Sequence, residues 1–434
     1  MGVFLNIMTA VLLAIFGIGY AAIAFENNIK INKTATALIT GVLSWVAFMY
    51  FAPDKSAVNM HLLEHLGDIS SILFFLLGAM TIIELIDAHD GFEIITDLIT
   101  QTEKRTLIWI IGFITFFLSS ILDNLTTTIV MVSLLRKLIR NPNDRLLFVG
   151  IVVIAANAGG AWTPIGDVTT TMLWIGGQIS TANIMMKLFL PSMACLLVPL
   201  AAISFQLHGK VERVLVTKGS KSKLLTKTQQ KIVLILGILI LILVPVFKTY
   251  TLLPPFMGML FGLGILWVVT EIIHGAAGHD EKQHLTLAHA LHRIDISTIL
   301  FFLGILMAIA ALETSGILTT TALWLSEKIG NLSVIVMSIG LSSAIIDNVP
   351  LVAATQGMYS LSQYPMDHFI WEFLAYCAGT GGSILIIGSA AGVAAMGMEK
   401  IDFFWYVKKI SWLALLGYFA GAAIYLLEES VFHF

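Results

Sequence analysis

Hydrophobic residues of this chain gather in long runs that short polar segments separate. A run of about 20 apolar residues is long enough for a helix to cross the hydrocarbon core of a bilayer. Such runs predict membrane-spanning helices over residues 3–25, 31–51, 69–88, 145–178, 184–208, 231–250, 253–273, 296–314, 366–398 and 403–427. The pattern therefore predicts an all-α polytopic membrane protein without a sizeable soluble domain.

Two further apolar segments, residues 105–138 and 332–362, are interrupted by polar residues near their middle. The first segment contains the stretch LSSILDN, which ends at Asn124. The second contains the stretch LSSAIIDN, which ends at Asn348. Each segment could be a kinked single span or a helical hairpin that enters and leaves the membrane on one side.

Basic residues decide between these alternatives, because cytoplasmic loops carry an excess of Lys and Arg. Lys104 and Arg105 precede the first segment and Arg136 and Lys137 follow it, which favours a re-entrant hairpin with both ends in the cytoplasm. If both segments are hairpins, all but four of the 24 Lys and Arg fall on one side. The four exceptions are Lys55, Lys187, Lys248 and Lys328. This topology predicts that both termini lie outside the cytoplasm.

An internal repeat relates the two halves of the chain. DISSILFFLLGAM from Asp68 resembles DISTILFFLGILM from Asp295, the two Asp-Asn segments follow, and NAGGAWTPIGD from Asn157 then matches GTGGSILIIGS from Gly379. We therefore expect two inverted-topology repeats, each with a re-entrant helical hairpin and a discontinuous transmembrane helix. They cover residues 1–208, with hairpin 105–138 and broken helix 145–178, and residues 231–434, with hairpin 332–362 and broken helix 366–398. A basic cytoplasmic linker, residues 209–230, joins them. Inverted repeats with broken helices are typical of secondary transporters, whose sites lie near the midplane.

Composition agrees with this interpretation. The chain is 58% hydrophobic and 12% charged, whereas soluble proteins contain about 25% charged residues. A net charge of -3 and the lack of a basic stripe argue against nucleic acid as a partner. Cys195 and Cys377 both lie in apolar segments and are interpreted as buried apolar residues.

Three carboxylates fall inside the predicted membrane region: Asp123 and Asp347 at the hairpin tips and Asp167 in the first broken helix. A charged side chain at the bilayer centre costs about 2.5–3.5 kcal/mol on insertion scales, so it needs a partner, a proton or water. The nearest Lys or Arg in sequence lies outside the hydrocarbon region for each of them. Proton or cation binding is the remaining explanation.

Neighbouring residues offer neutral oxygens to a hard cation such as Na+. They are Asn124, Thr126, Thr127 and Thr128 after Asp123, Ser342, Ser343 and Asn348 around Asp347, and Thr169, Thr170 and Thr171 after Asp167. Desolvation favours a protonated carboxyl group, whereas a bound cation favours the ionised one. Na+ and H+ would then bind competitively to the same carboxylates, which is a physical basis for antiport. Because Gly379 and Ser389 replace Asn157 and Asp167 in the second half, two identical sites are not expected.

Two other groups of residues are weaker candidates. Glu84 and Glu313 lie near the ends of related spans and are either proton-path residues or interfacial ones. The histidines of the cytoplasmic loop could bind a metal in a membrane-bound enzyme, but they form only one close pair; they are His274, His279, His284, His289 and His292. Scattered histidines in such a loop favour a solvated segment, and the chain is not predicted to be an enzyme.

The motifs DNLTTT, NAGGAWTPIGD and SSAIIDN resemble those of NhaD-type sodium/proton antiporters of the ion transporter superfamily, over about residues 69–400. The resemblance implies exchange of cytoplasmic Na+ or Li+ for external H+ by alternating access, with activation at alkaline pH and without a cofactor. It also implies a homodimer in the cell inner (plasma) membrane, in which each subunit has a scaffold domain and a mobile transport domain. It implies ion- or proton-binding roles for Asp123, Asn124, Asn157, Asp167, Thr169, Thr170, Asp347, Asn348 and Ser383, with Na+ at Asp123, Asn124, Asp167, Asp347 and Asn348.

The runner-up is an arsenite or Na+-coupled organic-anion carrier of the same superfamily. Members that carry dicarboxylates typically have Ser-Asn-Thr at the hairpin tips, whereas this chain has Asp-Asn at both. An acidic tip repels an anionic substrate and suits a cation. A channel is the third alternative, against which the broken helices and inverted repeats favour a carrier.

Overall fold

Helices make up nearly all the secondary structure of the described residues. The computed structural model describes residues 2–24, 26–94, 99–212, 226–274 and 287–432. In chain order the helices are α1 (Gly2–Ala24), α2 (Glu26–Ile29), α3 (Lys33–Phe51), α4 (Lys55–Ala88), α6 (Lys104–Leu122), α7 (Asn124–Leu138), α8 (Pro142–Gly160), α9 (Val168–Ile175), α10 (Thr181–Ser204), α11 (Lys227–Thr251), α12 (Pro255–His274), α13 (Leu287–Arg293), α14 (Ile296–Thr314), α15 (Ile317–Ile329), α16 (Leu332–Ser342), α17 (Asn348–Met358), α18 (Phe369–Gly381), α19 (Ala390–Glu399), α20 (Phe403–Tyr406), the π-helix η2 (Val407–Ser411) and α21 (Trp412–Phe432). Among the described residues, eight helices are long and apolar enough to cross a membrane. The predicted all-α, multi-span architecture is therefore confirmed.

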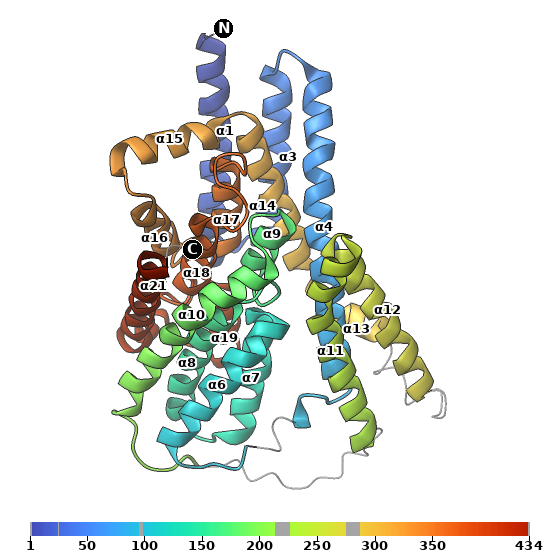
Figure 1. The fold of residues 1–434 in the computed structure, drawn as a ribbon, viewed down its shortest axis with the longest axis vertical. Helices are drawn as coiled ribbons and strands as arrows, with labels where there is room; N and C mark the ends of the chain where they lie inside the picture. Colours follow the sequence, from blue (N-terminus) through green and yellow to red (C-terminus); the bar gives the residue numbers. More distant parts are fainter. Residues whose placement is uncertain (1, 25, 95–98, 213–225, 275–286, 433–434) are drawn as a thin grey trace.

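The helices stop where polar residues and glycines interrupt the apolar runs. α8 ends at Gly160 and α9 begins at Val168, while α18 ends at Gly381 and α19 begins at Ala390. α6 and α7 are joined by Asp123 alone and pack side by side (Figure 1). The corresponding gap between α16 and α17 contains Asp347, the N-cap of α17.

Two of the longer elements differ from the sequence prediction. α4 starts at Lys55 rather than near residue 69, because Asp54 caps it by accepting hydrogen bonds from the Ser56 and Ala57 backbone N–H groups at 2.9 and 3.2 Å. Polar residues at its start hide the helix from a hydropathy criterion. α15 was not predicted at all; it lies crosswise to α1 in Figure 1 and is bent by 116° relative to α16. Its boundaries are glycines, Gly316 and Gly330, in the left-handed conformation that stops a helix.

Close helix pairs bring distant parts of the sequence together. α3 packs along α14, α10 along α21, and α12 along both α11 and α4. Gly41 and Gly304 allow the first contact, because a Cβ on Gly41 would lie 2.6 Å from the Gly304 carbonyl oxygen. α7 packs against α19, and α17 against α9. Residues that follow each Asp-Asn pair therefore meet the second part of the other half's interrupted helix.

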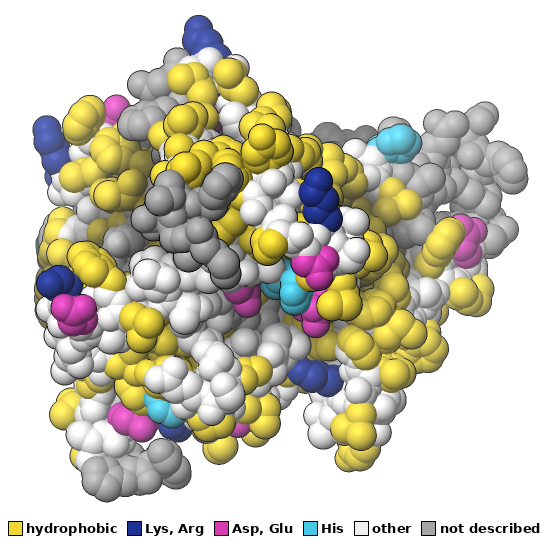
Figure 2. Space-filling view, turned by 90° about the horizontal axis from the view of Figure 1, so that it is seen from above, with side chains coloured by type: hydrophobic (Ala, Val, Ile, Leu, Met, Phe, Trp, Pro, Cys, Tyr) yellow, Lys and Arg dark blue, Asp and Glu magenta, His cyan; other side chains and the backbone are white. Residues whose placement is uncertain are grey.

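The outer surface is rich in large apolar side chains. Ile18 of α1 is 73% exposed, Ile235 of α11 is 63% exposed and Phe261 of α12 is 62% exposed. Seen from the N-terminal end of α1, hydrophobic side chains cover much of the described surface and charged ones stand singly or in small groups (Figure 2). Extended apolar surface of this kind is expected where a protein meets lipid.

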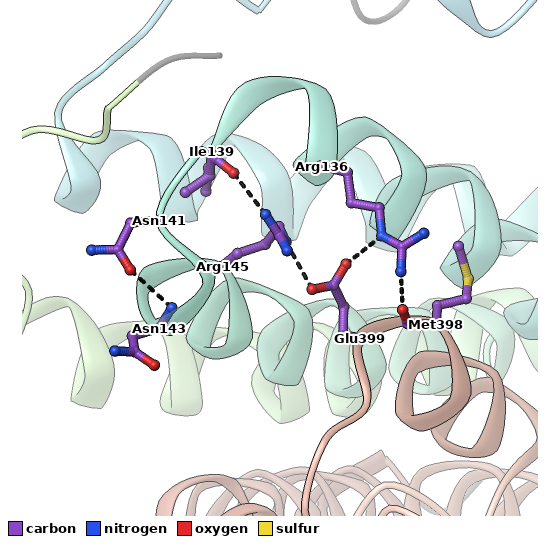
Figure 3. A network of polar contacts seen from close by, with 7 residues as sticks. All are labelled: Arg136, Ile139, Asn141, Asn143, Arg145, Met398 and Glu399. Atoms are coloured by element: carbon purple, nitrogen blue, oxygen red, sulfur yellow. Dashed lines mark hydrogen bonds and ion pairs between the residues drawn. The ribbon is translucent and has the colours of Figure 1, made fainter.

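A buried ion-pair network ties three helix ends together (Figure 3). The Glu399 carboxylate at the end of α19 lies 2.5 Å from Nε of Arg136 on α7 and 2.8 Å from Nε of Arg145 on α8. The side chain of Glu399 is only 2% exposed. This network fixes α19 against the helices that precede and follow residues 139–141.

Candidate functional site

Asp167 lies at the centre of a buried polar cluster. It is 1% exposed and precedes α9, whose first turn it caps. Its Oδ1 atom accepts hydrogen bonds from the backbone N–H and the hydroxyl of Thr169, both at 2.9 Å. A helix N-terminus stabilises a carboxylate through its free N–H groups and its dipole.

Two asparagine amides converge on Asp167 from the two Asp-Asn segments. Asn124 Nδ2 donates to Asp167 Oδ2 at 2.6 Å and to Asn157 Oδ1 at 3.0 Å. Asn348 Nδ2 lies 3.4 Å from both carboxylate oxygens of Asp167. Residues 124, 157, 167 and 348, which the sequence analysis selected, are therefore in one cluster, and all four are buried.

Asp123 adopts a strained backbone conformation at the junction of α6 and α7. Its φ of 87° and ψ of 158° fall in a region that only glycine enters readily. The side chain caps α7, since Oδ1 accepts from the Thr126 N–H at 2.8 Å and Oδ2 from the Thr126 hydroxyl at 2.9 Å. Such strain costs about 1–3 kcal/mol and is concentrated at functional sites.

A small cavity lies between Asp123 and Asp167. Its volume is about 20 Å³, and both aspartates line it together with apolar residues such as Phe75, Leu241 and Met259. A volume above roughly 10–15 Å³ can hold one water molecule. The cavity can therefore accommodate one water or one dehydrated small cation beside the two carboxylates.

Asp347 lines a different and much larger cavity of about 1410 Å³. Its own carboxylate accepts a hydrogen bond from the Val349 N–H at 3.3 Å. Tyr20 of α1 and Thr126 of α7 also line this cavity. Acidic side chains outnumber Lys and Arg in its wall: they are Glu26, Glu84, Asp87, Asp90, Glu93, Asp295 and Asp347, against Lys33, Lys137 and Arg293. An acidic, concave wall raises the local concentration of cations.

The remaining predicted residues lie around or away from the cluster. The Thr170 hydroxyl donates to the Asp167 carbonyl oxygen at 2.9 Å, whereas the Ser383 hydroxyl donates to the Thr380 carbonyl oxygen at 2.6 Å. Glu84 forms an ion pair with Arg293 at 2.8 Å in the wall of the large cavity. Glu313 is not among the residues that line that cavity; its carboxyl group lies beside Gly357 of α17.

Ser389 belongs to the cluster although the sequence analysis did not select it. Its hydroxyl oxygen accepts a hydrogen bond from Asn157 Nδ2 at 3.0 Å, and it caps α19 through the Gly392 N–H. Ser389 thus stands at the start of α19 as Asp167 stands at the start of α9. The repeat alignment, which pairs these two positions, carried the signal.

A metal centre of the enzyme type is not supported within the described part of the chain, where no group of three or more His, Cys, Asp or Glu could hold a metal ion. His279 and His284 lie outside the described residues. The free thiols Cys195 and Cys377 are both buried, as the sequence predicted.

Comparisons with known proteins match this chain to transporters. A family model described as "Citrate transporter" matches residues 20–381. The chain is 53% identical to sodium/proton antiporter 1 of Arabidopsis thaliana over 422 residues. This alignment covers 97% of this chain and 72% of that protein. It is 30% identical to the Na(+)/H(+) antiporter NhaD of Alkalimonas amylolytica over 457 residues, and this alignment covers 98% of this chain and 91% of that protein. The chain belongs to the NhaD family of sodium/proton antiporters.

Membership of the NhaD family confirms the resemblance that the DNLTTT and NAGGAWTPIGD motifs indicated. The matched proteins of known activity are transporters. The chain is therefore a multi-span membrane transporter and not an enzyme, and the expectation that no cofactor takes part agrees with this family.

Proposed function

We propose that this protein exchanges cytoplasmic Na+ or Li+ for external H+, with Asp167 as the central ion-binding group. The observation that carries the proposal is the convergence of Asn124 and Asn348 on one buried carboxylate. Buried charges require compensation, and the compensation here comes from side chains on two separate interrupted segments. A change in the relative position of those segments would change the affinity of Asp167 for an ion.

Rotation of the amides would convert the cluster into a cation site. The Nδ2 atoms of Asn124 and Asn348 face Asp167 and compensate its charge without a cation. Turning each amide by about 180° presents Oδ1 instead, and hard cations prefer oxygen ligands. Asp123 and the small cavity beside Asp167 would complete the site, and protonation of either carboxyl would compete with Na+.

The large cavity is the route by which a cation would reach this region. It opens among acidic residues and extends to Asp347 and Thr126 at the two Asp-Asn segments. Lys33, Lys137 and Arg293, which line it, all fall on the side that the charge distribution assigns to the cytoplasm. In this topology both termini lie outside the cytoplasm, the cavity faces inward, and Glu84 stands in its wall as a candidate proton-path residue.

Alternating access would then require the cavity to close on one side and another to open on the other. The two inverted repeats expected from the sequence, residues 1–208 and 231–434, would provide a structural basis for two such states. Re-entrant hairpins at 105–138 and 332–362 would form the mobile domain together with the interrupted helices. We expect a homodimer in the cell inner (plasma) membrane.

The proposal is tested by Na+-induced dissipation of a pre-formed pH gradient in everted vesicles, between pH 7 and 9.5. Wild-type protein should respond to Na+ and Li+ but not to K+ or citrate. Asp167→Asn should abolish the response, because asparagine keeps the helix cap but removes the charge. Asp402→Asn, at the exposed N-cap of α20, is the matched control and should respond like wild type. A full response in Asp167→Asn contradicts the mechanism, and a response to citrate alone favours the anion carrier.

A further inference from the structure

Lys248 is a lysine near the end of an apolar helix, and its head group contacts Trp174 of α9. It lies near the end of α11, one of the helices apolar enough to cross a membrane, and its side chain is partly buried. Nζ donates a hydrogen bond to the Trp174 carbonyl oxygen at 2.8 Å and lies 4.4 Å from the centroid of the Trp174 ring. A lysine near a helix end can extend its head group to the membrane interface, whereas both contacts hold this head group against α9.

The contact with Lys248 provides a hydrogen-bond donor to a backbone carbonyl at the C-terminal end of α9. Gly176 N–H donates to the Met172 carbonyl at 2.9 Å, and Gln178 N–H donates to the Leu173 carbonyl at 2.9 Å. The Trp174 carbonyl receives the Gly177 N–H at 3.4 Å, so Lys248 is its closer partner. A cation at this position also interacts favourably with the negative end of the helix dipole.

α9 is a short helix, so the position of its C-terminal end constrains the position of its N-terminal end. Its eight residues, Val168–Ile175, span about 12 Å, with Asp167 at the N-cap. Trp174 is 1% exposed and packs against Phe75 of α4 in an edge-to-face arrangement. A displacement of the Trp174 end would therefore move Asp167 relative to Asn124, whose amide is 2.6 Å away.

We propose that Lys248 is a positioning residue for the ion site: by holding the C-terminal end of α9 it sets the place of Asp167 between Asn124 and Asn348. This inference rests on the proposed role of Asp167 as the Na+ ligand. Lys248 does not touch the ion, so its loss changes the affinity for Na+ more than the maximal rate of exchange.

Purified protein in detergent gives a readout that does not depend on transport. A ligand that binds only the folded state raises the melting temperature in a concentration-dependent way, so a Na+ titration yields a midpoint. We expect Lys248→Met to raise this midpoint about five- to tenfold, a typical size for coupling between sites. Lys248→Arg, which keeps the charge, should return it to within about twofold of wild type. In vesicles, Lys248→Met should raise the KM for Na+ and leave the maximal rate nearly unchanged.

Lys328→Met is the matched control, because Lys328 is exposed and pairs only with its neighbour Glu327 at 3.7 Å among the contacts described. Its Na+ midpoint should equal that of wild type. If Lys248→Met does not accumulate, Lys248→Gln replaces it with the same expected rise, since the shorter uncharged side chain loses the ion–dipole contact. An unchanged midpoint in the Lys248 variant, with a normal Na+ response in wild type, overturns the positioning role alone. Absence of any Na+ stabilisation in wild type overturns the proposed Na+ site and this inference with it.

Discussion

The ion-pair network of Figure 3 allows a stability effect to be worked out from the structure. Glu399 is 2% exposed and contacts two arginines of unequal burial: the side chain of Arg145 is 16% exposed and that of Arg136 is 47% exposed. Glu399→Gln removes the shared negative charge but keeps the length of the side chain and one accepting oxygen. Arg145 then loses its charged partner and retains its hydrogen bond to the Ile139 carbonyl oxygen at 3.0 Å.

The two contacts contribute unequally. A hydrogen bond that involves a charged, largely buried group contributes about 1.5–3 kcal/mol, which applies to Arg145. A half-exposed pair contributes about 0–1 kcal/mol because water screens it, which applies to Arg136. With partial compensation by the glutamine oxygen, we expect a loss of about 2 kcal/mol, equivalent to a roughly 30-fold change in an equilibrium or rate constant.

Large membrane proteins often unfold irreversibly, so the rate constant of heat inactivation in detergent is the appropriate measurement. Glu399→Gln should accelerate inactivation by up to roughly 30-fold, and the exposed control Glu327→Gln should leave it unchanged. Double-mutant cycles with Arg145→Met and Arg136→Met separate the two contacts, and the coupling should be larger for Arg145. Additive effects of Glu399→Gln and Arg145→Met, or a larger coupling with Arg136, would refute the expectation that the more buried contact contributes more to stability.

Two further predictions concern the carboxylates of the site. Asp123→Gly should be more stable than Asp123→Ala by about 1–3 kcal/mol, because both lose the cap to Thr126 and only glycine relieves the backbone strain; equal inactivation rates for the two variants would show that the junction is unstrained. If one proton competes with Na+, the apparent KM for Na+ should fall roughly tenfold per pH unit as pH rises through the range in which the free site is protonated, with an unchanged maximal rate. A KM that is independent of pH, measured from Na+ titrations in vesicles at several pH values, would rule out competition.

Hydropathy and helix-breaking residues predicted most of the architecture. The apolar runs gave the spans, and the glycines of NAGGAWTPIGD and GTGGS marked the gaps after Gly160 and Gly381. α15 escaped prediction because its Thr-rich, partly exposed sequence between two glycines lacks the apolar length of a span. The start of α4 at Lys55 was not predicted, because His61, Glu64 and Asp68 lower the hydropathy of a segment that is nonetheless helical.

The sequence predicted most members of the polar cluster around Asp167 but not its geometry. The cost of burying a charge selected Asp123, Asp167 and Asp347 from their positions in the sequence, since each is an isolated charge in an apolar segment. No local pattern could show that Asn157 bridges Asn124 and Ser389, because those contacts join residues as many as 232 positions apart. Lys248 was noted only as one of the four Lys and Arg on the outer side, although its contact with Trp174 connects it to the same helix as Asp167.

The repeated Asp-Asn pair gains a more specific interpretation from these distances. The two asparagines converge on Asp167, whereas the two aspartates line separate cavities: Asp123 the small one beside Asp167 and Asp347 the large acidic one. An asparagine amide carries both a donor and an acceptor, so it can present either one, whereas a carboxylate can only accept unless it is protonated. Under the proposed exchange mechanism, the asparagine of each pair would adapt the coordination of Asp167, while its neighbouring aspartate would supply charge along the proposed route of the cation. Duplication of the pair would then supply both functions from each half of an otherwise asymmetric site.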